Sequence, residues 1–267
     1  MDYGDLSCSV METCVGYRCE HEPVTRARDV SLPMSAPPEP TSRAHGEALR
    51  NRLVVVLAVT SGAADALGFL ALGSAFTSVM TGNMVLFGVA TAHGDVSGML
   101  LTSVAIGAFV AGAALGTRVA GSPAPDDPVW PVAVTRALAV ECVLFTGVGI
   151  AWWALGSDPP SSAYLPLLAA SAAALGLQSS AIQRFGVSGL STTYLTGTLT
   201  TVVIRLTSGH GFRAVRHSAV ILLGLIVGAG LMAALIVVSP VLVPVLLVLS
   251  VGGVLAVVGL RREVLHR

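Results

Sequence analysis

Apolar stretches separated by short polar or proline-containing turns follow one another from residue 53 to residue 260. The stretches cover residues 53–72, 75–92, 98–120, 131–155, 164–182, 192–206, 219–238 and 241–260. Most of them approach the roughly 20 apolar residues that an α-helix needs to cross a bilayer. The pattern therefore predicts an all-α, polytopic helical membrane protein.

A short pattern recurs in the second and sixth stretches, as FTSVMTGNM at residues 76–84 and STTYLTGTL at residues 191–199. The Thr-Gly pair at 81–82 aligns with the pair at 196–197 without a gap. Glycine loosens a helix, and hydrocarbon cannot satisfy the hydroxyls or the amide of Asn83. We expect the two segments to face each other inside the protein. In the alternative interpretation, the glycines only let helices pack closely.

A second similarity extends the first. Residues 109–115 align with residues 225–231, and Gly112 matches Gly228, each in a GxxxG pattern. Such patterns are typical of close helix contacts in membranes. The sequence predicts two internal repeats, at residues 51–155 and 156–267.

The arginines bear on how many stretches cross the membrane, since cytoplasmic loops carry an excess of positive charge. If all eight stretches cross, Arg118, Arg136 and Arg184 lie outside. If the two TG segments instead enter and return on one side, every arginine from Arg43 onward is cytoplasmic. We favour six full spans plus two TG-broken, re-entrant segments in inverted halves. Residues 75–92 are nevertheless long enough to span, whereas residues 192–206 are marginal.

Residues 1–50 differ from the rest, because they are polar and contain four closely spaced prolines between residues 33 and 40. This composition is typical of a disordered tail, here expected to be cytoplasmic. Met34 offers an alternative start that would leave out the first 33 residues. Cys8, Cys14 and Cys19 lie in this tail with a spacing that matches no strong zinc motif.

Composition supports the class. Hydrophobic residues make up 54% of the chain, charged residues 11%, and the mean hydropathy is +0.79, which exclude a soluble core. The cations are all arginine, and no basic block predicts nucleic-acid binding. The chain lacks HExxH, GxSxG and Walker motifs, so we predict no catalytic residue, no metal site and no cofactor.

Ionisable residues inside the apolar stretches need a partner or a purpose, because a carboxylate at membrane depth costs about 2.5–3.5 kcal/mol. Asp65 lies among small residues near the middle of the first stretch. It is a candidate proton carrier, cation ligand, or hydrogen-bond acceptor that holds the turn at 81–83. Glu141 is expected to pair with Arg136 or Arg205. Gln178 occupies the second half close to where Asp65 lies in the first.

Several of these segments also carry a family resemblance: GAADALGF at 62–69, the TGN motif, GLQSS at 176–180 and TYLTG at 193–197. Together they resemble the YoaK-like bacterial membrane proteins, domain-of-unknown-function family 1275. The resemblance covers residues 53–260 and implies a small bacterial inner-membrane protein. It implies no substrate.

We therefore expect a small-solute transporter or channel-like permease of the bacterial inner membrane, with both termini cytoplasmic. Its partners would be the lipid bilayer and an unknown small solute, and a homo-oligomer is compatible with the sequence. The alternative is a non-transporting membrane protein with a structural, assembly or partner-binding role. The predicted substrate-binding residues are Asp65, Thr81, Gly82, Asn83, Gln178, Thr196 and Gly197.

Overall fold

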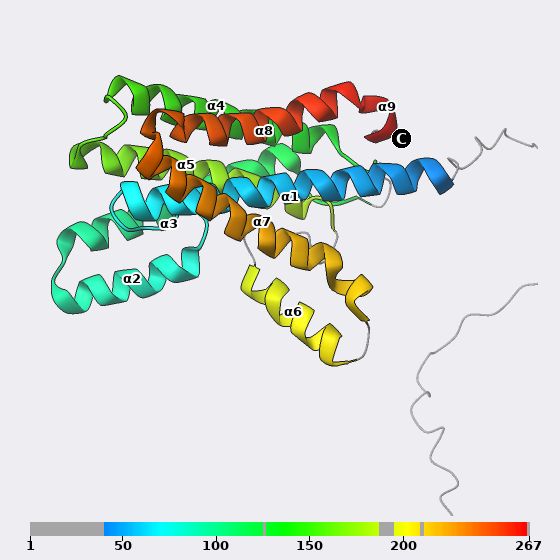
Figure 1. Ribbon diagram of the computed structural model, residues 1–267, viewed down its shortest axis with the longest axis horizontal. Helices are drawn as coiled ribbons and strands as arrows, with labels where there is room; N and C mark the ends of the chain where they lie inside the picture. Colours follow the sequence, from blue (N-terminus) through cyan, green and yellow to red (C-terminus); the bar gives the residue numbers. More distant parts are fainter. Residues whose placement is uncertain (1–39, 125–126, 187–194, 209–210, 266–267) are drawn as a thin grey trace, which may run out of the picture. The chain divides into compact units, whose positions relative to one another are not determined.

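The computed structural model describes residues 40–124, 127–186, 195–208 and 211–265, and within these ranges the regular structure is entirely helical. Figure 1 shows the arrangement. The helices are α1 (Pro40–Ala71), α2 (Met80–His93), α3 (Val96–Ala120), α4 (Val132–Ala154), α5 (Ser161–Gln183), α6 (Leu195–Thr207), α7 (Gly211–Val238), the 3-10 helix η1 (Pro240–Leu242), α8 (Val243–Leu260) and α9 (Arg262–Leu265).

Six helices in the described ranges are long and apolar enough to cross a membrane: α1, α3, α4, α5, α7 and α8. The prediction of a polytopic helical membrane protein is confirmed. The helices of the two TG segments are shorter, with 14 residues in α2 and 13 in α6. Neither reaches the roughly 17 residues that a spanning helix needs.

The second apolar stretch is not one helix, so the expectation that residues 75–92 could span was wrong. After α1 the chain turns through Gly73 and Ser74, which have φ angles of 93° and 64°. Residues 75–79 are then non-helical, and α2 begins only at Met80. Two residues with positive φ angles followed by a non-helical segment interrupt the helical hydrogen bonds, and this interruption shortens the helix.

The first helix starts earlier than the composition predicted. α1 begins at Pro40, a residue type favoured in the first helical turn, and residues 40–50 continue straight into the apolar part. Arg43 and Glu47 pair across one turn, with 3.8 Å between Arg43 Nε and Glu47 Oε1. The predicted disorder is therefore wrong for residues 40–50. Residues 1–39, with Met34 and the tail cysteines, lie outside the described residues.

Helices α1 and α7 pack with their backbones in contact. A Cβ atom on Gly62 would overlap the carbonyl oxygen of Leu225, and one on Gly228 would overlap the carbonyl oxygen of Val59. Each helix thus places a glycine against the other's backbone. This confirms that the second GxxxG pattern makes a close helix contact.

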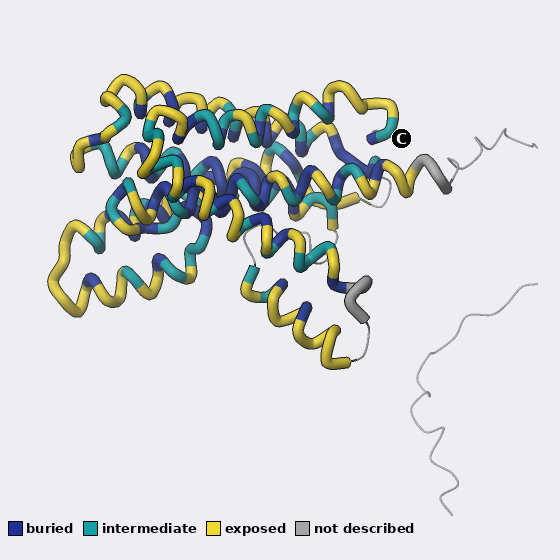
Figure 2. The backbone as a smooth tube through the Cα atoms, viewed as in Figure 1, coloured by how far each residue is buried: buried dark blue, intermediate teal, exposed yellow. Residues whose placement is uncertain are grey.

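Helices α3 and α5 pack in the same way. A Cβ atom on Gly112 would overlap the carbonyl oxygen of Ala173, and one on Gly176 would overlap the carbonyl oxygen of Phe109. The first GxxxG pattern therefore also makes a close helix contact. Figure 2 shows α1 and α5 among the most buried parts of the bundle, whereas α2 and α6 are mostly exposed.

The apolar core forms two clusters. One contains Leu57, Leu138 and Ile182, and the other contains Leu67, Phe145 and Leu168. Buried polar residues lie between the two clusters along α1, α4 and α5. We call this set, together with the serine of α8 that bonds to it, the polar layer: Thr60, Ser61, Glu141, Gln178 and Ser250.

The two ends of the bundle have different characters. At the arginine end lie the start of α1, the loop before α4 and the end of α5, with Arg50, Arg184 and Asp127. At the opposite end, the indole N–H groups of Trp152 and Trp153 donate to the Pro240 and Val241 carbonyls (2.9 and 2.8 Å). These bonds tie α4 to η1. Tryptophan at this level is typical of a membrane–water interface.

Candidate functional site: a helix break and a polar layer

The non-helical segment before α2 is bound to the side chain of Asp65. The Asp65 carboxylate accepts the Thr77 and Ser78 backbone N–H groups at 2.8 and 2.7 Å, and their hydroxyls at 3.2 and 2.5 Å. Asp65 is 6% exposed, so all four bonds lie in the interior. Hydrogen bonds to a charged group contribute about 1.5–3 kcal/mol each, which makes this the strongest polar anchor of the break.

Asn83 closes the other side of the same segment. Its amide oxygen accepts the Phe76 N–H at 2.8 Å, and its amide nitrogen donates to the Phe76 carbonyl at 2.7 Å. Both backbone groups of one non-helical residue are thus satisfied by one side chain. A backbone that has left the helix needs such partners wherever water is excluded.

One face of α1 is shaped to receive this segment. Asp65, Gly68 and Phe69 are three and four residues apart, a spacing that places side chains on the same helix face. A Cβ atom on Gly68 would lie 2.5 Å from the Ala75 carbonyl oxygen, and the rings of Phe69 and Phe76 stack with centroids 5.1 Å apart. The break is therefore folded back along α1 and packed against it.

Of the three roles considered for Asp65, the geometry shows the hydrogen-bond acceptor. The bound turn differs from the predicted one, because Asp65 holds Thr77 and Ser78 while Asn83, which lies within α2, holds Phe76. A role for Asp65 in carrying protons or cations stays a prediction.

The polar layer joins helices from both halves of the chain. The Gln178 side-chain nitrogen of α5 donates to the Ser61 hydroxyl of α1 at 2.8 Å and to the Leu57 carbonyl at 3.2 Å. The Thr60 hydroxyl donates to the Ser250 hydroxyl of α8 at 2.8 Å. Ser61 and Asp65 are four residues apart, so the layer lies one helical turn from the break.

Glu141 departs from the prediction. It is fully buried on α4, and neither carboxyl oxygen has a hydrogen-bond partner. The ion pairs among the described residues join Arg43 to Glu47 and Arg184 to Asp127, so the expected pairing with Arg136 or Arg205 is wrong. An ionised carboxylate in these surroundings would be costly. The neutral acid is the form that fits the site.

The predicted site residues fall into three groups. Asp65 and Asn83 meet at the break, and Gln178 lies one turn away in the polar layer. Thr81 and Gly82 lie in the first turn of α2, which packs against α3, and Thr81 is exposed.

Thr196 and Gly197 begin α6, which packs against α7, and Thr196 is also exposed. Neither short helix has the other as its main packing partner. The expected face-to-face arrangement of the two TG helices is therefore not what the described residues show. Residues 187–194, which include residues 191–194 of the second motif, lie outside the described residues.

Three residues whose side chains bond directly to Asp65 or Gln178 were not predicted to belong to the site: Ser61, Thr77 and Ser78. Two signals pointed to them. Ser61 precedes Asp65 by four residues, so both lie on one helix face. Thr77 and Ser78 belong to the repeated pattern, and residues with hydroxyl groups occupy the same two positions in its second copy, as a glycine does at the position of Gly82.

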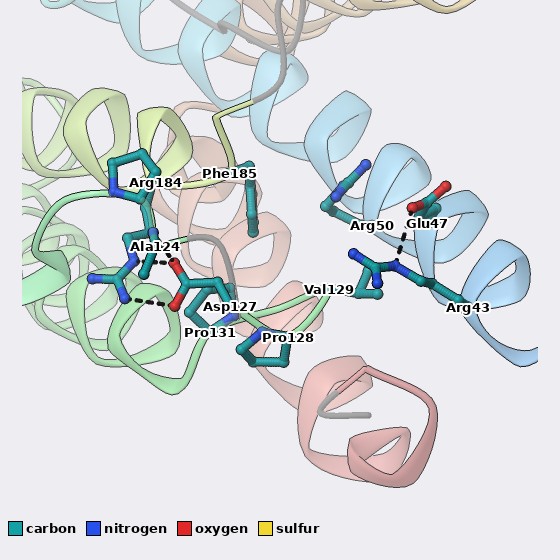
Figure 3. A pocket seen from close by; sticks show the side chains of 11 residues that line it. Arg43, Glu47, Arg50, Ala124, Asp127, Pro128, Val129, Pro131, Arg184 and Phe185 are labelled. Carbon is teal, nitrogen blue, oxygen red and sulfur yellow. Dashed lines mark hydrogen bonds and ion pairs between the residues drawn. The ribbon is translucent and has the colours of Figure 1, made fainter. Parts of the chain in front are cut away.

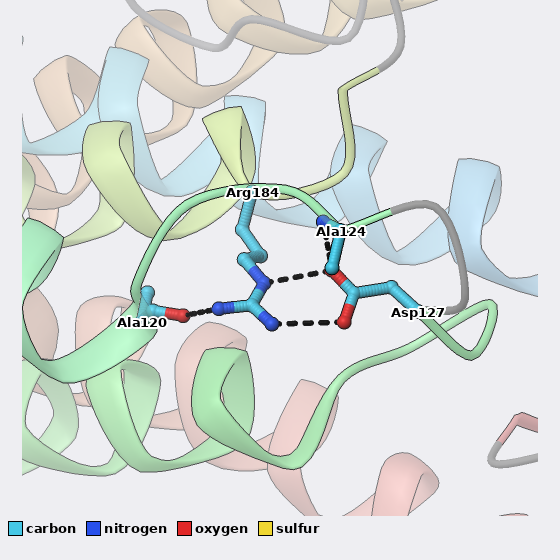
Figure 4. A network of polar contacts seen from close by, with 4 residues as sticks. All are labelled: Ala120, Ala124, Asp127 and Arg184. Carbon is cyan, nitrogen blue, oxygen red and sulfur yellow. Dashed lines mark hydrogen bonds and ion pairs between the residues drawn. The ribbon is translucent and has the colours of Figure 1, made fainter.

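A second cluster of polar contacts lies at the arginine end (Figure 4). Arg184 holds both oxygens of Asp127, with Nε–Oδ2 at 2.9 Å and Nη2–Oδ1 at 2.8 Å, and also donates to the Ala120 carbonyl. The Ala124 N–H donates to the same carboxylate at 2.9 Å. The hydrogen bonds from Arg184, more than that from Ala124, lower the pKa of Asp127, and the Asp127 carboxylate raises the pKa of Arg184.

Comparison with known proteins identifies the family. The sequence profile of the family described as "Protein of unknown function (DUF1275)" matches residues 53–260. The chain belongs to the DUF1275 family. This DUF1275 chain is also similar to the UPF0700 transmembrane protein YoaK of Bacillus subtilis (strain 168). The two are 33% identical over 160 residues, which cover 58% of this chain and 67% of YoaK. No solved structure matches.

The family match includes the whole of the break and the polar layer, because residues 53–260 contain Asp65, Asn83, Glu141 and Gln178. It leaves out most of the charged start of α1. The DUF1275 resemblance expected from the sequence motifs is confirmed.

Proposed function

We propose that this DUF1275 protein is a small-solute transporter or channel-like permease of a bacterial cytoplasmic membrane. The observation that carries the proposal is the non-helical segment that Asp65 and Asn83 hold against the middle of the bundle. Irregular backbone at membrane depth is tolerated where it is buried in protein or lines a cavity, and transporters use it to form binding sites.

An inverted internal repeat is part of the proposal, and the glycine contacts support it. Gly62 and Gly176 are 114 residues apart, and Gly112 and Gly228 are 116 apart. Under this correspondence α1 matches α5, and α3 matches α7, so the α1–α7 and α5–α3 glycine contacts are the same contact made twice. Repeats of this kind, with a site at their interface, are common in secondary transporters.

The two short helices fit the same scheme. In Figure 1, α2 and α6 extend from the middle of the bundle toward opposite ends. Their N-terminal ends therefore lie at membrane depth, where the helix dipole places partial positive charge. In this proposal they are re-entrant half-helices, one from each repeat, and six helices cross the membrane.

The groups available to a solute are polar and mostly uncharged. The polar layer offers the Ser61 hydroxyl, the Gln178 amide and the Glu141 acid. At the end of the bundle away from the arginine end, two pockets of about 350 and 500 Å³ are both lined by Gly73 and Ser74, the residues that lead into the break. A path from these pockets to the polar layer would pass the segment held by Asp65.

A non-transporting role is the second candidate, and specific observations favour it. Thr81 and Thr196 are exposed, and the Asp65 carboxylate is already engaged by four hydrogen bonds. In that case the break would only shape the bundle. The two candidates differ in whether water reaches the polar layer during the working cycle.

Thiol accessibility tests the proposal without a known substrate. Cys8, Cys14, Cys19 and Cys142 would be replaced by serine or alanine, and Ser61→Cys or Gln178→Cys introduced. Intact cells and inverted vesicles would then be treated with a charged, hydrophilic thiol reagent. A permease that opens to either side should expose both positions from at least one side.

Two control positions show what an unreactive and a reactive cysteine look like in the same assay. Val143→Cys, on the exposed face of α4 expected to contact lipid, should stay unmodified, and Ser97→Cys, at the exposed start of α3, should react. Unreactive cysteines at both 61 and 178, with both controls behaving as stated, would favour the non-transporting role.

A further inference from the structure

A pocket of about 400 Å³ lies at the arginine end, away from the break. Arg43, Glu47 and Arg50 project from α1 on one side of it, and the Arg184–Asp127 pair lies on the other (Figure 3). Its volume falls in the range of about 300–1,000 Å³ that is typical of small-ligand pockets.

Arg50 is the unusual member of this lining. It is only 9% exposed, its Nε atom is buried, and that atom has no hydrogen-bond partner. Its guanidinium lies 5.6 Å from the centroid of the Phe185 ring, a cation–π contact. Such a contact holds the guanidinium in place without supplying an acceptor for its N–H groups. A buried N–H group without an acceptor, such as that of Arg50 Nε, is destabilising.

The other charges of the pocket are already engaged. Arg184 holds Asp127 with two short hydrogen bonds, and Arg43 has its Nε atom 3.8 Å from Glu47. Three arginines face two carboxylates here, so one positive charge is in excess. Of the three, Arg50 is the one with no ion pair within 4 Å among the described residues, although the charge of Glu47 also acts on it.

We propose that this pocket binds a phosphate-bearing anion, with Arg50 as its principal ligand. The guanidinium fork matches phosphate oxygens in two-point geometry, and charge-assisted hydrogen bonds of this kind are short and strong. Phosphate would supply the acceptor that Arg50 lacks, and Arg43 could swing from Glu47 to a second oxygen because both of these side chains are half-exposed or more.

The phosphate has two chemical sources at this place. It is the headgroup of an anionic lipid if the pocket opens to the bilayer surface, as arginine-rich pockets between spanning helices often do. It is part of a soluble phosphorylated compound if the pocket opens to water. The proposal is independent of solute transport, since none of its residues belongs to the break or the polar layer.

The test uses the purified full-length chain in neutral detergent and follows its apparent Tm through tryptophan fluorescence. One arm adds inorganic phosphate against sodium chloride of equal ionic strength. The other arm compares dioctanoyl phosphatidylglycerol with dioctanoylglycerol, which lacks only the phosphate headgroup. We expect a saturable rise in Tm with at least one phosphate probe. A rise with lipid alone assigns a headgroup, and a rise with inorganic phosphate assigns a soluble source.

Variants show whether Arg50 is the ligand. Arg50→Gln should weaken the apparent Kd about tenfold or more. It should not lower Tm without ligand, because it removes an unpaired buried charge. Arg52→Gln is the matched control, since Arg52 is exposed on another face of α1. Should Arg50→Gln not fold, Glu47→Gln tests the same site, because removing the competing carboxylate should tighten binding.

Three results would overturn the proposal. The first is the absence of a saturable rise with either phosphate probe. The second is equal binding by wild type and Arg50→Gln. The third is unchanged binding by Glu47→Gln where Arg50→Gln cannot be purified.

Discussion

Asp65 and Ser78 are joined twice: the Ser78 N–H and the Ser78 hydroxyl each donate to a different oxygen of the Asp65 carboxylate, at 2.7 and 2.5 Å. The residues are 13 positions apart, yet they lie side by side because the chain folds back after α1. The acid of one apolar helix, α1, thereby stabilises the non-helical segment that precedes the next helix, α2.

Replacing Asp65 with asparagine should destabilise the protein. Asparagine keeps one acceptor oxygen for the Thr77 and Ser78 N–H groups, but it removes the negative charge, and its amide group replaces the oxygen that accepts from the Ser78 hydroxyl. A loss of about 1.5–3 kcal/mol is expected, which corresponds to a fall in apparent Tm of about 3–12 °C. Asp95→Asn is the control, because Asp95 caps α3 through the Gly98 N–H (3.0 Å) and asparagine caps a helix equally well. Equal Tm values for Asp65→Asn and wild type would remove the anchoring role.

Alanine at either crossing glycine should disrupt its helix pair. In Gly62→Ala or Gly176→Ala the new methyl group would overlap a backbone carbonyl that cannot rotate away, so the helices must separate. A loss of about 1–3 kcal/mol or more is expected in detergent unfolding.

The matched controls are Gly230→Ala in α7 and Gly147→Ala in α4, where a Cβ atom would meet nothing within 4 Å. Because alanine is the better helix former, these variants should be as stable as wild type or more so. If the crossing and control variants behaved alike, the close packing of α1 on α7 and of α5 on α3 would be in doubt.

Glu141 should carry a proton at neutral pH, since both of its oxygens are buried without a partner. Infrared difference spectra of wild type and Glu141→Gln in lipid should then differ by a protonated-carboxyl band, and Tm should not fall. Glu263→Gln, at an exposed position in α9, should remove no such band. Loss of a carboxylate band in Glu141→Gln would show that the acid is ionised and has a partner.

The Asp127–Arg184 pair should make stability depend on pH. Because the Arg184 hydrogen bonds lower the pKa of Asp127 in the folded protein, the pair stabilises the fold above the unfolded pKa of about 3.9. That stabilisation is lost as the pH falls through the lowered pKa. The Tm difference between wild type and Asp127→Asn should therefore be largest near pH 7 and shrink below about pH 4. Asp158→Asn, in the exposed loop before α5, should differ little from wild type throughout.

The sequence allowed the class, the six long apolar helices and the close-packing glycines to be predicted, because each follows from a local pattern of apolar or small residues. The importance of Asp65 also followed, since an acid at membrane depth needs partners. The hydrogen-bond partners of Asp65 could not be predicted from the sequence. Thr77 and Ser78 reach Asp65 only because Gly73 and Ser74 turn the chain back, and a hydropathy pattern does not show that turn because it lies within a largely apolar region.

The error at Glu141 has a related cause. The sequence suggested Arg136 or Arg205 as the partner of Glu141. In the structure Glu141 faces the interior because it lies on the same face of α4 as the buried Leu138 and Phe145. The surroundings of Arg50 were equally hidden, because its cation–π contact joins α1 to Phe185, which lies just after the end of α5 and far along the chain.

The sidedness of residue 184 tests the central claim, that six helices cross and the two short ones return. The measurement is modification of Arg184→Cys, in a chain whose native cysteines are replaced, by a membrane-impermeant thiol reagent, with Ser157→Cys on the opposite end as its counterpart. If six helices cross, residue 184 should react in inverted vesicles and residue 157 in intact cells. Modification of residue 184 in intact cells would contradict that claim.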